Sequence, residues 1–254
     1  MFSWFRSLAS PRGQKTPAPA IPMGQRVYIV GDIHGRYDLL RILHEQVEAD
    51  SSTYNGHKRL VYLGDYIDRG HESKKVVEEL VSHPLAGFDR IFLKGNHEDA
   101  LLNFLVDFNA ARDWFQFGGE ATVFSYGVAM QPGTRSDKML KDIQADLDRA
   151  IPAEHIQFFN ELRMSFEIGD YFCVHAGIHP SRPLHRQRSE DLMWIRDEFL
   201  ESKKAHEKII VHGHSISETP DEQSNRIGID TGAYYSNCLT CLVLEATERR
   251  FLQT

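Results

Sequence analysis

The sequence predicts an α/β fold in which central mixed β-sheets are flanked by helices. Three observations predict it: short apolar runs rich in β-forming residues, a helical apolar pattern after each run, and glycine in the loop between them. This strand–loop–helix unit occurs three times in a row, with a repeat of about 30 residues. Such repeats favour parallel strands with right-handed crossovers, so the three loops should meet at one sheet edge.

The apolar pattern also predicts where each element lies. Strands are expected at residues 27–30, 60–63 and 91–93, and later at 171–174, 209–211, 226–229 and 239–244. Helices are expected at residues 37–49, 73–81, 95–108, 136–150 and 152–162. Residues 1–25 are rich in Pro, Ala and Ser after Leu8 and have no periodicity, so we expect a flexible N-terminal arm to which the sequence assigns no partner.

Composition excludes several classes of function. The 254 residues carry a formal net charge of −7, which argues against nucleic acid as a partner, because nucleic-acid binders neutralise phosphates with cations. No apolar run approaches the roughly 20 residues that span a bilayer, so no transmembrane segment is expected. Three cysteines form no disulfide framework, which favours a reducing, cytoplasmic location. The unusual count is histidine, with 13 residues.

Five loops place a possible metal ligand beside glycine. They read GDIHG (31–35), GDYIDRG (64–70), GNHE (95–98), HAG (175–177) and HGHS (212–215), and most follow an apolar β-rich run. Asp32 and His34 are two residues apart, so in an extended segment both side chains point to one face. Asp65 and Asn96 follow at steps of 33 and 31 residues, which is one strand–loop–helix unit each.

These ligand types predict a site for two divalent cations. Mixed Asp, Asn and His ligands without cysteine suit borderline or hard ions, with Mn expected and Fe or Zn as alternatives. The five loops supply six candidate ligands, which is more than one four-coordinate ion needs. They suffice for two ions if Asp65 bridges them. Taken alone, any one of these loops would be read as a turn with a structural histidine; their order and spacing favour one shared site.

The five motifs closely resemble those of the phosphoprotein phosphatase branch of the calcineurin-like metallophosphoesterases, and in particular the bacterial serine/threonine protein phosphatases. That family's pattern is GDxHG, GDxxDRG, GNHE, HAG and a late Gly-His, and the resemblance covers about residues 26–245. It implies the calcineurin-like metallophosphoesterase fold, with one catalytic domain over residues 26–254.

The resemblance also implies a ligand set. One metal would be held by Asp32, His34, Asp65 and His214, and the second by Asp65, Asn96 and His175, with Asp65 bridging. His212 is a rival for His214, because both lie on one face of an extended segment; the family's glycine precedes its ligand, which favours His214.

Catalytic groups are implied in the same way. His97 matches the family's general acid and Asp68 its carboxylate partner, while a metal-bridging hydroxide would be the nucleophile. Arg69 matches a phosphate-binding arginine, Arg196 resembles the second phosphate arginine of bacterial members, and Asn96 would also contact the phosphate. The glycines and Glu98 are expected to shape the loops.

The substrate is predicted less directly than the metals. Asp68-Arg69 and GNHE depart from symmetrical dinucleoside tetraphosphate hydrolases, which usually have Ala-Arg and GNHD at these places. The segment Trp114 to Gly127 resembles bacterial protein phosphatases (W…GG…T…SYG). We therefore expect hydrolysis of phosphoserine or phosphothreonine in proteins, with phosphotyrosine as a further substrate of the same kind. The alternatives are hydrolysis of a dinucleoside polyphosphate such as diadenosine tetraphosphate and, least favoured, a non-catalytic metal-binding regulatory module.

Overall fold

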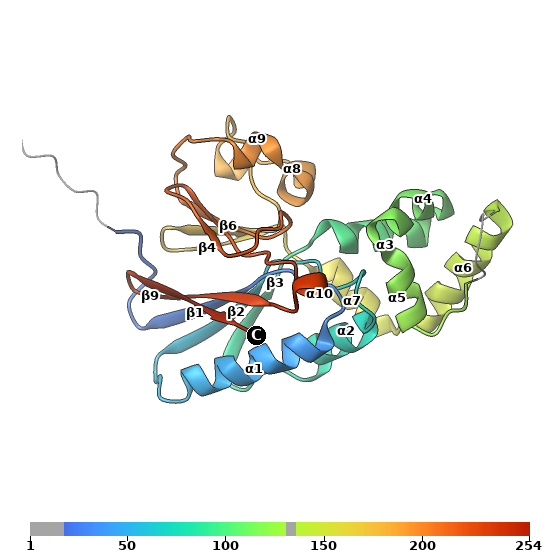
Figure 1. Ribbon diagram of the computed structural model, residues 1–254, viewed down its shortest axis with the longest axis horizontal. Coiled ribbons are helices and arrows are strands. Elements are labelled where there is room, and N and C mark those ends of the chain that lie inside the picture. Colours follow the sequence, from blue (N-terminus) through green and yellow to red (C-terminus); the bar gives the residue numbers. More distant parts are fainter. Residues whose placement is uncertain (1–17, 131–135) are drawn as a thin grey trace, which may run out of the picture.

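Two five-stranded β-sheets pack against each other in the computed structural model, with helices on their outer faces and at one end (Figure 1). The structure describes residues 18–130 and 136–254. The predicted α/β fold with central mixed sheets and flanking helices is confirmed.

The first sheet has the strand order β10-β9-β1-β2-β3. Strands β1 (Gln25–Val30), β2 (His57–Tyr62) and β3 (Phe88–Phe92) pair in parallel, and each is followed by a helix: α1 (Tyr37–Ser51), α2 (Ser73–Ser82) and α3 (Asn96–Val106). The three predicted strand–loop–helix units are therefore present. Strands β9 (Thr240–Glu245) and β10 (Glu248–Gln253) complete the sheet in antiparallel pairing.

The second sheet has the strand order β4-β5-β6-β8-β7. Strands β5 (Tyr171–Val174), β6 (Ile209–His212) and β8 (Arg226–Gly228) are parallel, and β4 (Ser165–Ile168) and β7 (Asp221–Glu222) flank them in antiparallel pairing. Strands β4, β7 and β10 were not predicted from the sequence. All three are edge strands with polar residues in place of a long apolar run.

The core explains why the central strands read as continuous apolar runs. Along β1, Val27 and Ile29 pack in a cluster between the two sheets, with Val211 of β6 on the other side. Tyr28 and Val30 point the opposite way, into the cluster under the helices. A strand buried on both faces needs apolar residues at every position, so period-2 alternation disappears.

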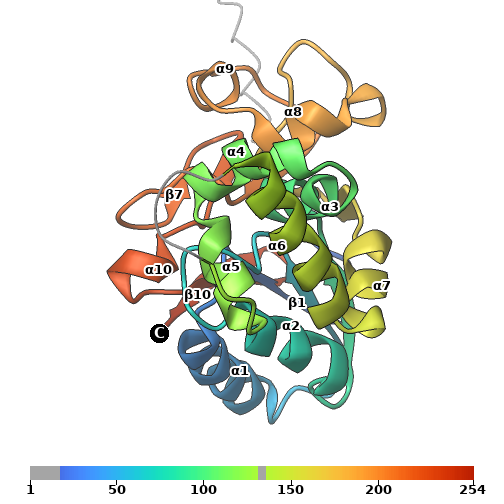
Figure 2. The ribbon, with the colours of Figure 1, turned by 90° about the vertical axis from the view of Figure 1, so that its right-hand side faces the viewer.

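The remaining helices gather beside the sheets, where Figure 2 shows α3, α5, α6 and α7 in front of them. Helices α6 (Asp137–Ala150) and α7 (Ala153–Glu161) match the predicted ones. The short elements were not predicted, because one or two turns of helix are too short to show a periodicity. They are η1 (Phe108–Ala110), α4 (Ala111–Trp114), η2 (Phe115–Phe117), α5 (Gly119–Ser125), η3 (Leu184–Arg186), α8 (Ser189–Trp194), α9 (Asp197–Leu200) and α10 (Ala233–Ser236).

Part of the segment predicted to be a flexible N-terminal arm, residues 1–25, contacts the domain. Residues 1–17 lie outside the described part of the chain, but Ala20, Ile21 and Gly24 already contact the domain. Ile21 is 3% exposed and its amide donates to the carbonyl of Ala246, while the amide of Ala20 donates to Asp170. Ile21 belongs to the core between the sheets, which the Pro/Ala-rich composition around it concealed. Among the helices described, none is long and apolar enough to cross a membrane.

Candidate metal centre

Loops from both sheets converge at the ends of their parallel strands. Asp32, His34 and Asp65 lie in the loops after β1 and β2, and Asn96 and His97 open helix α3. His175 and His214 follow β5 and β6 of the second sheet. The convergence predicted from the loop spacing is what the structure shows, and the two sheets each contribute part of the site.

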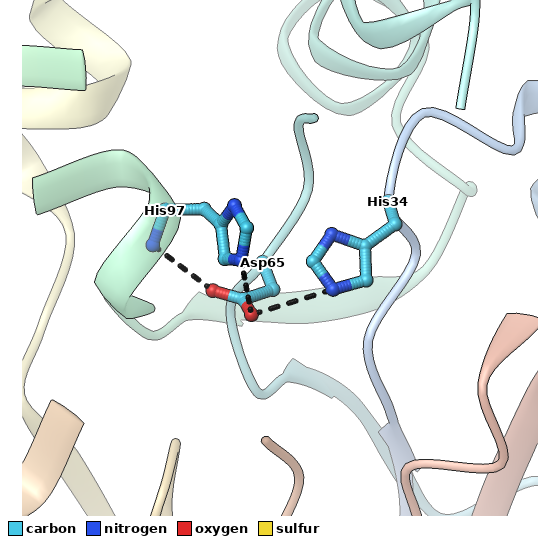
Figure 3. Close-up of side chains that lie close together, drawn as sticks. All are labelled: His34, Asp65 and His97. Carbon is cyan, nitrogen blue, oxygen red and sulfur yellow. Dashed lines mark hydrogen bonds and ion pairs between the residues drawn. The ribbon is translucent and has the colours of Figure 1, made fainter. Parts of the chain in front are cut away.

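Asp65 lies at the centre of the site and is shared by two ligand clusters. The first cluster contains His34, Asp65 and His97, and the second contains Asp65, His175 and His214. In each cluster the potential ligand atoms lie within 4.8 Å of one another. Figure 3 shows the first cluster, in which Oδ2 of Asp65 lies 3.5 Å from Nε2 of His34 and 3.7 Å from Nε2 of His97.

The second cluster approaches the other oxygen of the same carboxylate. Oδ1 of Asp65 lies 3.3 Å from Nε2 of His175. Burial would raise the pKa of Asp65, but the four histidines around it outweigh burial and hold its pKa below the usual value. Asp65 is therefore ionised, with one oxygen facing each cluster, as a bridging ligand requires.

Buried atoms without hydrogen-bond partners show that the clusters fit metal ions. Oδ1 of Asp32, Nε2 of His34 and Nε2 of His214 are all buried and have no such partner. Leaving a buried polar atom unpaired is costly, and a coordinated cation would remove that cost. Burial also lowers the pKa of His34 and of His214, which keeps both rings neutral and able to act as ligands.

The tautomers of two histidines point their lone pairs into the site. Nδ1 of His34 donates to the carbonyl of Ile67 at 2.9 Å, and Nδ1 of His175 donates to the carbonyl of Leu63 at 3.0 Å. Since a carbonyl can only accept, Nδ1 carries the hydrogen and Nε2 is free to bind a metal.

Asn96 supplies a further ligand atom to the second cluster. Its Oδ1 lies 2.9 Å from Nε2 of His175. Because Nδ1 of His175 already carries the hydrogen, these two facing atoms are both acceptors, and a shared cation would relieve their repulsion. Asn96 begins α3, so the helix holds its side chain in place.

His214 lies in the site and His212 does not. Nδ1 of His212 is 3.0 Å from the carbonyl of Gly213, and its Nε2 lies 3.4 Å from Arg226, away from both clusters. The grouping of His214 differs from the one that the resemblance implied. Its ring joins Asp65 and His175, because β5 and β6 are parallel neighbours, and only its backbone amide reaches Asp32, at 3.0 Å.

Asp32 lies outside the two groups of atoms within 4.8 Å of one another, but it has an oxygen free to bind a metal. Its Oδ2 accepts from the amide of His214, and its Oδ1 is the buried, unpaired atom named above. A Cβ added at Gly213 would lie 2.0 Å from Oδ1 of Asp32, so glycine is required for this close approach.

His97 and Asp68 form a buried pair. Nδ1 of His97 lies 2.6 Å from Oδ2 of Asp68, and both side chains are at most 1% exposed. Burial lowers the pKa of His97, but Asp65 and Asp68 outweigh it and raise that pKa above its ordinary value. A charged imidazolium beside the ligand clusters is able to give a proton to a leaving group.

Two residues that hold Asp68 were missed as functional groups. Nε1 of Trp114 donates to Oδ2 of Asp68 at 2.8 Å, and Oγ1 of Thr122 donates to Oδ1 at 2.6 Å. Both come from the segment Trp114 to Gly127, which the sequence singled out only through the family resemblance. The unusual pairing of an isolated tryptophan with the two glycines after it was the available signal.

Glu98 ties two of the loops together. Its carboxylate accepts from the amides of Asp65 at 2.9 Å, Tyr66 at 2.8 Å and Gly95 at 3.0 Å. Burial and the charge of Asp65 raise the pKa of Glu98 to about 8, and the amide hydrogen bonds oppose that rise. The predicted loop-shaping function of Glu98 matches these contacts.

Both predicted phosphate-binding arginines lie at the site. Nη2 of Arg69 is 3.3 Å from Nε2 of His97, and the guanidinium stands 4.8 Å from the ring centre of Tyr234. Nη1 of Arg196, an exposed residue, donates to the carbonyl of His214 at 3.4 Å. Two guanidinium groups thus border the clusters, where an anionic substrate would need them.

The backbone is strained where these side chains are presented. Of the seven described non-glycine residues with positive φ, five belong to the predicted site: His34 (46°), Asp65 (52°), Asp68 (72°), Arg69 (65°) and His214 (62°). Each such conformation costs about 1–3 kcal/mol, and strain of this kind concentrates at functional sites. The fold therefore maintains these loops at the expense of stability.

A shared buried carboxylate between two groups of histidine ligands, with an acid pair and two arginines beside it, defines a metal-dependent phosphoesterase site. The sequence model of the calcineurin-like phosphoesterases matches residues 25–238. The chain belongs to that family, which uses a dinuclear metal centre, and the resemblance drawn from the motifs is confirmed.

Similar proteins divide between two kinds of substrate. The chain is 25% identical over 233 residues to the asymmetrical bis(5'-nucleosyl)-tetraphosphatase PrpE of Bacillus mycoides (strain KBAB4), covering 84% of this chain and 88% of that one. It is 38% identical over 84 residues to the serine/threonine-protein phosphatase rdgC of Drosophila melanogaster, covering 32% and 12%. Among solved structures, a putative diadenosine tetraphosphatase has a TM-score of 0.60 at 22% identity, covering 93% and 98%.

Proposed function

We propose that this phosphoester hydrolase acts on dinucleoside tetraphosphates and cleaves them asymmetrically. The observation that carries the proposal is the match with bis(5'-nucleosyl)-tetraphosphatases over most of both chains, whereas the match with a protein phosphatase covers 32% of this chain. This reverses the order expected from Asp68-Arg69 and GNHE, which separated the chain only from symmetrical hydrolases.

The ligand set supports two divalent cations, for which we propose Mn, with Fe or Zn as alternatives. Asp32, His34 and Asp65 would hold one, and Asp65, Asn96, His175 and His214 the other. When bound, such cations polarise phosphoryl oxygens and make a bound water acidic enough to attack phosphorus. Arg69 and Arg196 bind and orient the phosphate oxygens.

His97 and Asp68 supply the proton that the leaving group needs. In asymmetrical cleavage one outer anhydride P–O bond breaks, the water oxygen joins the freed phosphorus, and a nucleoside monophosphate and triphosphate are released. His97 gives its Nε2 proton to the leaving oxygen, and Asp68 keeps the ring oriented through Nδ1.

Phosphoserine or phosphothreonine in proteins is the second candidate. The 38% identity to a serine/threonine phosphatase favours it locally, and so does the acid pair. A seryl or threonyl oxygen leaves as a strongly basic alkoxide and depends on a proton donor, whereas a phosphate leaving group is far less basic.

Initial rates distinguish between a dinucleoside tetraphosphate and a phosphoprotein as the substrate. Protein loaded with Mn is assayed with diadenosine tetraphosphate and with phosphoserine and phosphothreonine peptides, and kcat/KM is compared. We expect the dinucleotide to be favoured at least about tenfold, with AMP and ATP as products. A preference for the phosphopeptides, or two molecules of ADP as products, would contradict the proposal and leave the metal centre intact.

A further inference from the structure

Four aromatic side chains stand around the ligand clusters. Tyr234 and Tyr235 lie in α10, Phe117 in η2, and Trp194 ends α8. Three of them are exposed to solvent: Tyr235 at 57%, Phe117 at 37% and Tyr234 at 36%. Helices α8 and α10 are separated in both views of the molecule (Figures 1 and 2).

These aromatic residues form two pairs, one at each end of a chain of ring contacts across the site. At one end the rings of Tyr235 and Tyr234 are 5.0 Å apart, and Tyr234 lies 5.7 Å from His34. At the other end Phe117 lies 6.2 Å from His97 and 5.6 Å from Trp194.

The histidines join the two pairs. The rings of His34 and His97 are 4.6 Å apart, so the chain of contacts is unbroken from Tyr235 to Trp194. The Phe117–Trp194 pair also borders the second cluster, because Trp194 lies 6.4 Å from His214. The Tyr234–Tyr235 pair borders the first.

The exposed rings are held in place rather than free to rotate away. A Cβ at Gly232 would lie 2.4 Å from the ring of Tyr235, so this ring packs directly on the glycine although the residue is 57% exposed. Arg69 stands over Tyr234, and Trp194 supports Phe117. A rigid aromatic surface loses little conformational entropy when a ligand stacks on it.

Between the two pairs the site is built for anions, with Arg69, Arg196 and the ligand clusters. The order of groups is therefore aromatic, cationic, aromatic. A dinucleoside polyphosphate has the complementary order: base, polyphosphate, base. A phosphorylated peptide side chain offers at most one ring next to its phosphate.

We propose that the Tyr234–Tyr235 pair and the Phe117–Trp194 pair are two base-stacking subsites, which bind the two nucleobases of a dinucleoside polyphosphate whose phosphates lie at the metal centre. This proposal rests on the proposed function and specifies which residues select the substrate. Base–aromatic stacking tolerates any base, so the subsites select two bases on a polyphosphate chain rather than adenine in particular.

Binding is measured by calorimetry on protein loaded with Mn. The probes are a non-hydrolysable, methylene-bridged diadenosine tetraphosphate and methylenediphosphonate, which has no base. Tyr235→Ala and Phe117→Ala should each weaken binding of the dinucleotide by roughly 5- to 150-fold, the usual range for one stacked base. Binding of methylenediphosphonate should stay within about twofold, and Tyr235→Phe should bind as the wild type does.

Phe124→Ala is the matched control. Phe124 is 55% exposed and lies in α5, and within the described ranges it makes no ring contact with the histidines of the clusters. The proposal is wrong if Tyr235→Ala and Phe117→Ala bind the dinucleotide as tightly as the control does. It is also wrong if they weaken the binding of both probes equally. The proposal would also be overturned if Tyr235→Ala and Phe117→Ala turned over a phosphotyrosine peptide more slowly but bound the dinucleotide as the wild type does. The aromatic residues would then bind the side chain of a protein substrate.

The two proposals fail in different ways. If the wild type binds the analogue, the variants weaken that binding, and yet authentic diadenosine tetraphosphate is not hydrolysed, the proposed function is wrong and the subsites stand. If the wild type hydrolyses it and the variants do so with unchanged KM, the function stands and the subsites are wrong. If the wild type does not bind the analogue, both are wrong.

Discussion

The position of His97 would allow it either to bind a metal or to transfer a proton, and a single substitution distinguishes these two functions. Its Nε2 belongs to a cluster with His34 and Asp65, as a ligand would, while its Nδ1 is bonded to Asp68. The neighbouring carboxylates favour the protonated ring, which donates and does not coordinate. We therefore assign proton transfer to His97.

The variant His97→Asn should lower kcat by about 10²–10⁴, the usual contribution of an acid–base group. The loss should be larger for an alkyl phosphate than for a phosphoanhydride, because the alkoxide leaving group is more basic. Bound metal, measured by mass spectrometry, should be unchanged. Loss of metal together with activity would show that His97 is a ligand; His71→Asn, at an exposed histidine, is the control.

At the scale of elements, the short helices α4 and α5 matter because they deliver Trp114 and Thr122 to Asp68. Thr122→Val keeps the side-chain volume but removes the hydroxyl that donates to the buried carboxylate. A hydrogen bond to a charged group contributes about 1.5–3 kcal/mol. We expect kcat to fall by at least about tenfold, with metal content and KM retained.

Ser125→Ala is the matched control for that variant. Ser125 lies in the same helix. Its hydroxyl accepts from the amide of Lys74 and donates to the carbonyl of Thr122, and it does not bond Asp68. Equal kcat values for Thr122→Val and Ser125→Ala would show that the support of Asp68 does not affect catalysis.

Helix α1 contains a buried histidine, His44, that lies away from the metal centre. Nε2 of His44 bonds the hydroxyl of Tyr62 at 2.9 Å, and burial, with Arg41 and Arg90, lowers the pKa of His44 to about 4. Between pH 6.5 and 4 the unfolded chain binds a proton here and the folded chain does not, so stability falls as the pH falls.

His44→Gln should make that fall shallower by up to about 3 kcal/mol across the window. The free energy of unfolding in urea, measured at pH 7 and pH 4.5, tests this. His185→Gln, at an exposed histidine, should follow the wild-type pH dependence. If His44→Gln also follows it, the pKa of His44 is not lowered by folding.

At the scale of the whole molecule, the metal centre joins the two sheets. Asp32 and Asp65 come from loops of the first sheet, and His175 and His214 from loops of the second. Cations held between them would crosslink the sandwich, and a ligand that binds only the folded state stabilises it by about 2.7 kcal/mol at 100 times its Kd.

Chelation should therefore lower the melting temperature as well as abolish activity, and added Mn should restore both. Asp65→Asn is the control, because without the shared carboxylate it retains one ion at most, so the chelator should lower its melting temperature by less than that of the wild type. A wild-type protein whose melting temperature and activity are the same in chelator would contradict the crosslink.

Much of this architecture is predictable from sequence where burial or backbone geometry constrains residue type. Strand β1 is apolar at successive positions because both of its faces are buried, and the ligands stand beside glycines because of close approaches such as Gly213 to Asp32. Polar edge strands such as β7 carry no such pattern. The contact of Thr122 with Asp68 spans 54 residues and depends on tertiary packing, which no local pattern encodes.

The number of metal ions per chain tests the central claim most directly. Protein loaded with Mn, freed of excess metal and measured by mass spectrometry should contain two ions per chain, and Asp65→Asn should retain one at most. A wild type that binds no metal and hydrolyses phosphoesters in chelator, or an Asp65→Asn variant that retains both ions, would contradict a dinuclear centre built on Asp65.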